Sequence, residues 1–89
     1  MSKSPLRNIP LKTFRDYLYW KGLNPVRATG GHEIWKGMGL FRTISLPTHV
    51  NPVSEMVVRS ILKTLGADAN DYIEFLKSYN ENRKMKKIK

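Results

Sequence analysis

The chain has 89 residues, which is enough for one domain with a modest core and leaves little room for a second. It contains no cysteine, which excludes disulfide bonds, thiolate metal sites and cysteine nucleophiles. No run of 18 or more apolar residues is present, so the sequence predicts no membrane span. Because the first residues lack an apolar signal core, we expect a cytoplasmic protein.

The positive charge is large and unevenly distributed. The formal net charge is +9, with +6 on residues 1–45, −2 on residues 46–82 and +5 on residues 83–89. A basic field of this size favours polyanions, most often nucleic acid. Charge alone leaves DNA, RNA and an anionic membrane surface open as partners. A basic chain end is also typical of a disordered solubility segment.

The first predicted elements are an arm and a helix. Residues 1–9 are expected to form a flexible arm that precedes a single domain over residues 10–79. Pro10 suits a first helical turn. The apolar residues that follow recur at helical spacing, namely Leu11, Phe14 and Leu18. Gly22 is typical of a left-handed helix end, so we expect a helix over about Pro10–Lys21.

Three short strands are predicted next. They cover about Asn24–Thr29, His32–Lys36 and Leu40–Leu46. The glycine-containing turns Gly30-Gly31 and Gly37-Met38-Gly39 separate them. Two such turns so close together indicate an antiparallel meander.

The second half of the chain reads as helical. Ser54 is expected to cap a helix that ends at Gly66. Asp68 is expected to cap a short last helix, followed by a basic tail over residues 80–89 that we expect to be disordered. The apolar stripes of the two helices are Val58, Ile61, Leu62 and Leu65, and then Ala69, Tyr72, Ile73 and Leu76.

This order of elements predicts an α+β fold. A three-stranded antiparallel sheet with the helices packed on one face is the economical arrangement. The opposite face of the sheet would then be open to a ligand or partner.

Common catalytic motifs are missing from the sequence. There is no phosphate-binding Walker loop, no dinucleotide fingerprint and no Gly-x-Ser-x-Gly nucleophile elbow. Two histidines without cysteine do not make a structural zinc site. The carboxylates of the second half read as helix caps and solvated faces. We therefore expect no metal and no cofactor.

The two histidines remain as candidates for chemistry. Imidazole exchanges protons near neutral pH, and RNA supplies its own nucleophile, the 2′-hydroxyl. A small basic protein with one well-placed histidine could cleave RNA without a metal. His32 lies where a turn becomes a strand, and its alternative role is that of an ordinary surface residue. For His49 the alternative is a loop residue bonded to the backbone.

Several residues are candidates for binding RNA. Lys36, Arg27 and Arg42 belong to the same predicted sheet as His32 and could hold phosphate. Trp35 could either stack on a base or belong to the core. The predicted RNA-binding set is completed by Gly30, Gly31 and His49.

Four stretches in chain order resemble the HicA-type (YcfA-like) toxin family. They are "YWKGLNPV", "GGHEIW", "ISLPTH" and "VRSILKTLG". The family pattern has a first helix ending in Leu/Lys-Gly-Phe, a Gly-Ser-His-His-x-aromatic strand, a Val-Pro-x-His strand end and a Leu-Arg-x-Ile-Leu-Lys-x-x-Gly helix. Members are small ribonucleases that form the toxin half of HicA–HicB toxin–antitoxin pairs. The similarity spans about Leu11 to Leu76.

The resemblance implies a double-stranded-RNA-binding-like fold of α-β-β-β-α order, which agrees with the elements predicted above. It also implies that His32 is catalytic, that mRNA is the substrate, and that a HicB-like antitoxin protein covers the site. The chain departs from the pattern at Gly31, where the family has serine, and at Glu33, where it has a second histidine. The loop before the second long helix is one residue shorter and contains Asn51-Pro52-Val53.

Three hypotheses follow. The first is a metal-independent endoribonuclease toxin in which His32 is the general acid/base and Lys36, Arg27 and Arg42 hold phosphate. The second is a non-catalytic RNA-binding module that uses the same face. The third, a DNA-binding domain, is disfavoured because the predicted 54–66 helix has only two basic residues for groove contacts, Arg59 and Lys63.

Overall fold

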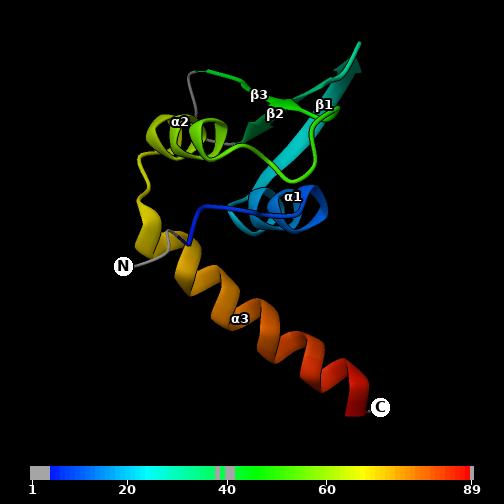
Figure 1. Ribbon diagram of the computed structural model, residues 1–89, viewed down its shortest axis with the longest axis vertical. Helices are drawn as coiled ribbons and strands as arrows, with labels where there is room; N and C mark the ends of the chain where they lie inside the picture. Colours follow the sequence, from blue (N-terminus) through cyan, green and yellow to red (C-terminus); the bar gives the residue numbers. More distant parts are fainter. Residues whose placement is uncertain (1–4, 38, 40–41, 89) are drawn as a thin grey trace.

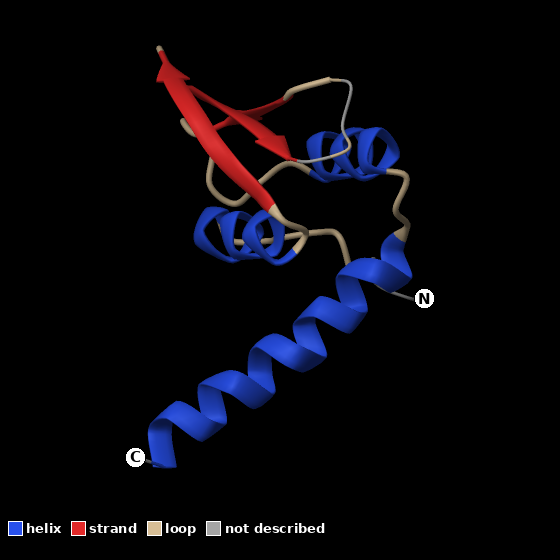
Figure 2. Cartoon of the chain, turned by 180° about the vertical axis from the view of Figure 1, so that it is seen from behind, coloured by secondary structure: helices blue, strands red, loops and turns tan. Residues whose placement is uncertain are grey.

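The computed structural model describes residues 5–37, 39 and 42–88, with side chains as far as residue 79. Six elements follow one another: α1 (Leu11–Trp20), β1 (Leu23–Thr29), β2 (His32–Gly37), β3 (Ile44–Pro47), α2 (Glu55–Leu65) and α3 (Ala69–Ile88). The strands form one antiparallel sheet in the order β1-β2-β3. The predicted α+β fold and its α-β-β-β-α order are therefore confirmed, and α1 and α2 lie on the same side of the sheet (Figures 1 and 2).

Two elements differ from their predicted bounds by more than one residue at an end. β3 begins at Ile44 and reaches Pro47, whereas the sequence predicted a strand from residue 40; residues 40 and 41 lie outside the described part of the chain. α3 is 20 residues long and runs past the rest of the fold to Ile88, where we expected a short helix and a disordered tail (Figure 1). No glycine or proline interrupts it, and its Lys, Arg, Glu and Met residues favour helix. Across the described residues, no helix is both long and apolar enough to cross a membrane.

The end of the N-terminal arm belongs to the core. Leu6 and Ile9 are both buried, and Ile9 pairs with Val53 in an isolated bridge, in which its carbonyl accepts the Val53 N–H at 2.8 Å. The expectation of a loose arm up to Ile9 is therefore wrong for this stretch. Burying these two apolar side chains ties the arm to the loop before α2.

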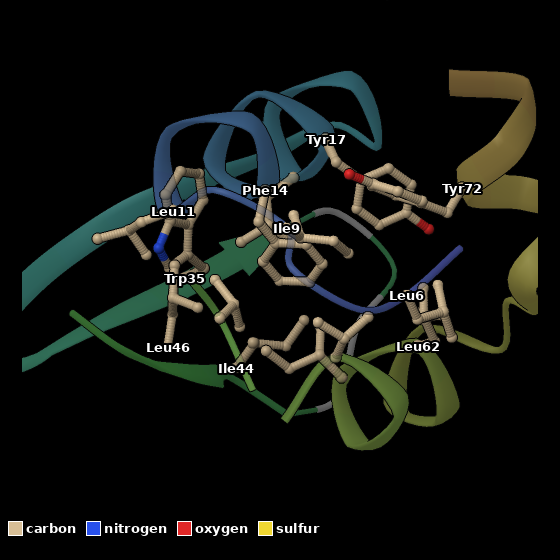
Figure 3. Close-up of a cluster of buried hydrophobic side chains, with 14 of the residues drawn as sticks. Leu6, Ile9, Leu11, Phe14, Tyr17, Trp35, Ile44, Leu46, Leu62 and Tyr72 are labelled. Carbon is tan, nitrogen blue, oxygen red and sulfur yellow. The ribbon is translucent and has the colours of Figure 1, made fainter. Parts of the chain in front are cut away.

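The core fills the space between the inner face of the sheet and the helices (Figure 3). Trp35 of β2 is its largest buried side chain, which decides between the two roles considered for it. Phe14 of α1, Leu46 of β3 and Leu62 of α2 are buried in the same cluster. On α3 the buried stripe runs through Tyr72 and Phe75, not through Ile73 as the spacing suggested.

The helix ends follow local sequence signals. Ser54 Oγ accepts the N–H groups of Met56 and Val57 at 3.2 and 3.5 Å, which satisfies donors of the first turn of α2. Gly66 ends α2 in the left-handed conformation at φ 71°. Asp68 caps α3 through the N–H of Asp71 at 3.1 Å. These three predicted signals are confirmed.

One polar contact between helices was not expected. The buried Tyr17 of α1 donates its hydroxyl to Asp71 of α3 at 2.7 Å, and Lys21 forms an ion pair with the same carboxylate at 2.9 Å. Burial, and then the contact with Asp71, raise the pKa of the Tyr17 hydroxyl. Partial burial by itself would raise the pKa of Asp71, but the hydrogen bonds from Tyr17 and Lys21 outweigh it and lower that pKa. The contact fixes α3 against α1.

Candidate active site on the open face of the sheet

The alternation of β2 divides its side chains between the two faces of the sheet. Trp35 is buried against the helices, and Glu33 points the same way because residues two apart on a strand share a face. His32, Ile34 and Lys36 therefore lie on the opposite face. No helix covers that face in the described chain (Figures 1 and 2).

The strand register adds neighbours from β1 and β3. Thr29 and Pro47 stand directly opposite His32, while Arg27 stands opposite Ile34. Directly opposed residues share a face, so Arg27 joins His32 on the open face, as its diagonal neighbour at about 7–8 Å between Cα atoms. A register shift between Pro25 and Arg27, which leaves Val26 unpaired, brings Arg27 into this position.

The second histidine comes to the same end of the sheet. The ring centroids of His32 and His49 are 5.8 Å apart, with the planes inclined at 59°. Pro47 lies opposite His32, so the loop that follows β3 brings His49 beside it. The sequence identified both residues but did not predict that they meet.

The glycine turn holds the loop of His49 in place. Gly31 has φ 89°, a conformation that favours glycine. Its carbonyl accepts the Thr48 N–H at 2.7 Å and lies 3.3 Å from Nδ1 of His49. A Cβ at this residue would lie 3.3 Å from the same Nδ1, closer than ordinary contact. The resembled family has serine at this position, and the glycine found here leaves room for the imidazole of His49.

The predicted cations are not all brought together. Arg27 flanks His32, whereas Lys36 is four residues further along β2, roughly 13 Å away at the rise of an extended strand. Lys36 would therefore reach a different phosphate of a bound polyanion. Arg42 precedes β3 and is not on the sheet, contrary to our expectation; with Ser60 and Lys63 it lines a surface hollow beside α2.

Glu33 is directed away from the histidines. Its carboxylate accepts two hydrogen bonds from Arg15 of α1, at 3.1 and 2.8 Å, and one from Nε1 of Trp35 at 3.2 Å. The negative charge of Glu33, which stands where the resembled family has a histidine, is thus paired with Arg15 on the inner face of the sheet. The sequence placed Glu33 beside His32 but gave no sign of Arg15, which is 18 residues away.

None of the described acidic side chains lies on the open face. Apart from Glu33, they belong to the helices or to the turn before α3. Among the described residues, no three His, Cys, Asp or Glu side chains gather as metal ligands would. The open face therefore combines two imidazoles and cationic side chains with no described carboxylate, an arrangement suited to an anion and to proton transfer.

Comparisons of the chain with protein-family models, with curated proteins and with solved structures find no match.

Proposed function

We propose that the protein is a metal-independent endoribonuclease that uses His32 for acid/base catalysis and the 2′-hydroxyl of RNA as the nucleophile. The observation that carries the proposal is the pair of imidazoles 5.8 Å apart at one end of an open sheet face, with Arg27 beside them. A phosphodiester held by Arg27 would lie next to a group able to exchange protons. The guanidinium would also stabilise the charge that develops on phosphorus oxygens.

The biological role we propose rests on the resemblance to the HicA-type family. In that role the protein is the toxin of a toxin–antitoxin pair, acts on mRNA in the cytoplasm and is neutralised by a HicB-like antitoxin. The open face supports such a partner, because it carries Arg27 and Lys36 and no described acidic side chain. An antitoxin with an acidic surface would match this charge and cover the histidines.

Cleavage of end-labelled RNA in the presence of EDTA tests the proposed activity. The wild type, His32→Ala and Lys77→Ala are compared on a gel, with circular dichroism to establish that each is folded. Lys77 is an exposed residue of α3, away from the sheet, and serves as the control. We expect the wild type and Lys77→Ala to cut RNA and His32→Ala to bind without cutting. Cutting by His32→Ala at the wild-type rate would contradict the proposal.

The second candidate function is a non-catalytic RNA-binding module. The same basic, uncovered face favours this function. Arg27 and Lys36 lie on separate strands, so the sugar-phosphate backbone of an RNA could contact both. In this case the wild type and His32→Ala would retard RNA equally, and neither would shorten it.

A further inference from the structure

We propose that His49 is a second catalytic residue, the general base that takes the proton of the attacking 2′-hydroxyl, while His32 is the general acid. This inference rests on the proposed ribonuclease function and deepens it, because that function by itself requires only one histidine. In the proposed mechanism, two imidazoles share the proton transfers. The fold brings them together, one from β2 and one from the loop after β3.

The hydrogen bond of His49 determines which of its nitrogens is free. A backbone carbonyl can only accept, so the contact of Nδ1 with the Gly31 oxygen at 3.3 Å requires a proton on Nδ1. In the neutral ring the lone pair is then on Nε2, and this is the form that a general base needs. Among the described residues, no hydrogen bond engages that nitrogen, and the side chain is exposed.

The Gly31 carbonyl acts as the orienting group of the pair. It is itself held by the Thr48 N–H at 2.7 Å, so the residue next to His49 fixes the acceptor that aligns the ring. The same carbonyl can keep its hydrogen bond when Nε2 gains a proton, because Nδ1 remains a donor in the imidazolium. His49 therefore takes up a proton without a change in its orientation.

His32 is suited to the complementary step. Its ring centroid lies 5.8 Å from that of His49, so both imidazoles can contact one phosphate group. The described carboxylates lie in the helices, in the turn before α3 and, for Glu33, on the inner face, so none of them competes with the two imidazoles there. Arg27, the diagonal neighbour of His32, stays protonated and can only hold charge.

The reaction balances with these two groups alone. His49 Nε2 removes the 2′-hydroxyl proton as the 2′-oxygen forms its bond to phosphorus. The bond from phosphorus to the 5′-oxygen of the next nucleotide breaks, and His32 gives that oxygen a proton. The products are a 2′,3′-cyclic phosphate and a 5′-hydroxyl end. One proton has passed to His49 and one has left His32, and exchange with water restores both.

The test compares His49→Asn with His32→Ala. The asparagine amide reaches as far as Nδ1 and can keep the hydrogen bond to the Gly31 carbonyl, but it cannot accept a proton. Each variant is assayed on ordinary RNA and on RNA whose leaving 5′-oxygen is replaced by sulfur, with Lys77→Ala as control. Sulfur departs as a thiolate and needs no general acid.

On ordinary RNA we expect each histidine variant to be slower than wild type by about 10²–10⁴-fold, the usual contribution of a general acid or base. The sulfur substrate should restore the rate of His32→Ala and leave His49→Asn slow. If His49→Asn cuts ordinary RNA as fast as wild type while His32→Ala does not, the inference is overturned and the ribonuclease function stands. Rescue of His49→Asn instead of His32→Ala would reverse the assigned roles. Absence of cutting by the wild type would overturn the function and the inference together.

Discussion

Removal of the Tyr17 hydroxyl should destabilise the protein by an amount that depends on pH. Tyr17→Phe keeps the aromatic ring in the core and deletes the 2.7 Å hydrogen bond to Asp71. A hydrogen bond to a charged group contributes about 1.5–3 kcal/mol. The Asp71 side chain is 28% exposed and retains Lys21, so water and the ammonium group compensate in part. We therefore expect a loss at the low end, about 1.5 kcal/mol, or a fall in Tm of roughly 6–12 °C.

The pH dependence follows from the lowered pKa of Asp71. A carboxyl group with a depressed pKa in the folded state stabilises the fold above its ordinary value of 3.8. That contribution is lost as the pH falls below 3.8 and through the lowered pKa. Because Tyr17→Phe removes one cause of the depression, the difference between wild type and variant should be complete at pH 7 and shrink below pH 3.8.

Urea unfolding followed by circular dichroism at several pH values measures this difference. Tyr72→Phe is the matched control, because Tyr72 is also a buried tyrosine of the same aromatic cluster, and burial raises its pKa to about 12. Among the described residues, the Tyr72 hydroxyl makes no hydrogen bond to a carboxylate of the kind that Tyr17 makes to Asp71, so the effect of Tyr72→Phe should not change between pH 7 and pH 3. If Tyr17→Phe is as stable as wild type, or if the difference is constant with pH, the hydrogen bond between Tyr17 and Asp71 does not stabilise the fold in this way.

Three further predictions concern the arm, a helix cap and the phosphate contact. Leu6→Ala should cost about 2–5 kcal/mol in urea unfolding because Leu6 is buried, and a loss near zero would show that the arm is loose. Ser54→Ala should cost about 1 kcal/mol by loss of the α2 cap, whereas Ser60→Ala within α2 should cost nothing; equal effects would contradict the cap. Arg27→Ala should weaken RNA binding and reduce the slope of log K against log salt by about 0.7, the value for one phosphate of a single strand. Arg59→Ala on α2 should leave that slope unchanged, and an unchanged slope for Arg27→Ala would exclude a phosphate contact.

Local features of the fold could be predicted because their causes are local. Ser54 and Asp68 cap the turns that follow them, and Gly66 ends a helix by its own conformational freedom. The Gly30-Gly31 turn between β1 and β2 could be predicted for the same reason, whereas the second predicted turn includes Met38, which lies outside the described residues. The alternation of β2 limited the possible faces, although only packing decided that Trp35, and not Ile34, belongs to the core.

Contacts between distant residues could not be predicted in this way. The Asn51 side chain accepts the N–H of Leu11 at 3.0 Å, and Tyr17 reaches Asp71 across 54 residues. Neither pairing has a signal in the spacing of the sequence. The meeting of His32 and His49 depends on β3 ending at Pro47 opposite His32. A shift in strand register of one residue would have moved the side chains to the other face, and the sequence did not fix that register.

The proposed activity is cleavage of RNA through its 2′-hydroxyl, assisted by histidine on the open face. The most direct measurement maps a cleavage position on end-labelled RNA in EDTA and then replaces the 2′-hydroxyl at that position with hydrogen. We predict that cutting stops at the substituted position alone, and that the unmodified RNA yields a 2′,3′-cyclic phosphate and a 5′-hydroxyl. Cutting at the substituted position, or products with a 5′-phosphate, would contradict this activity.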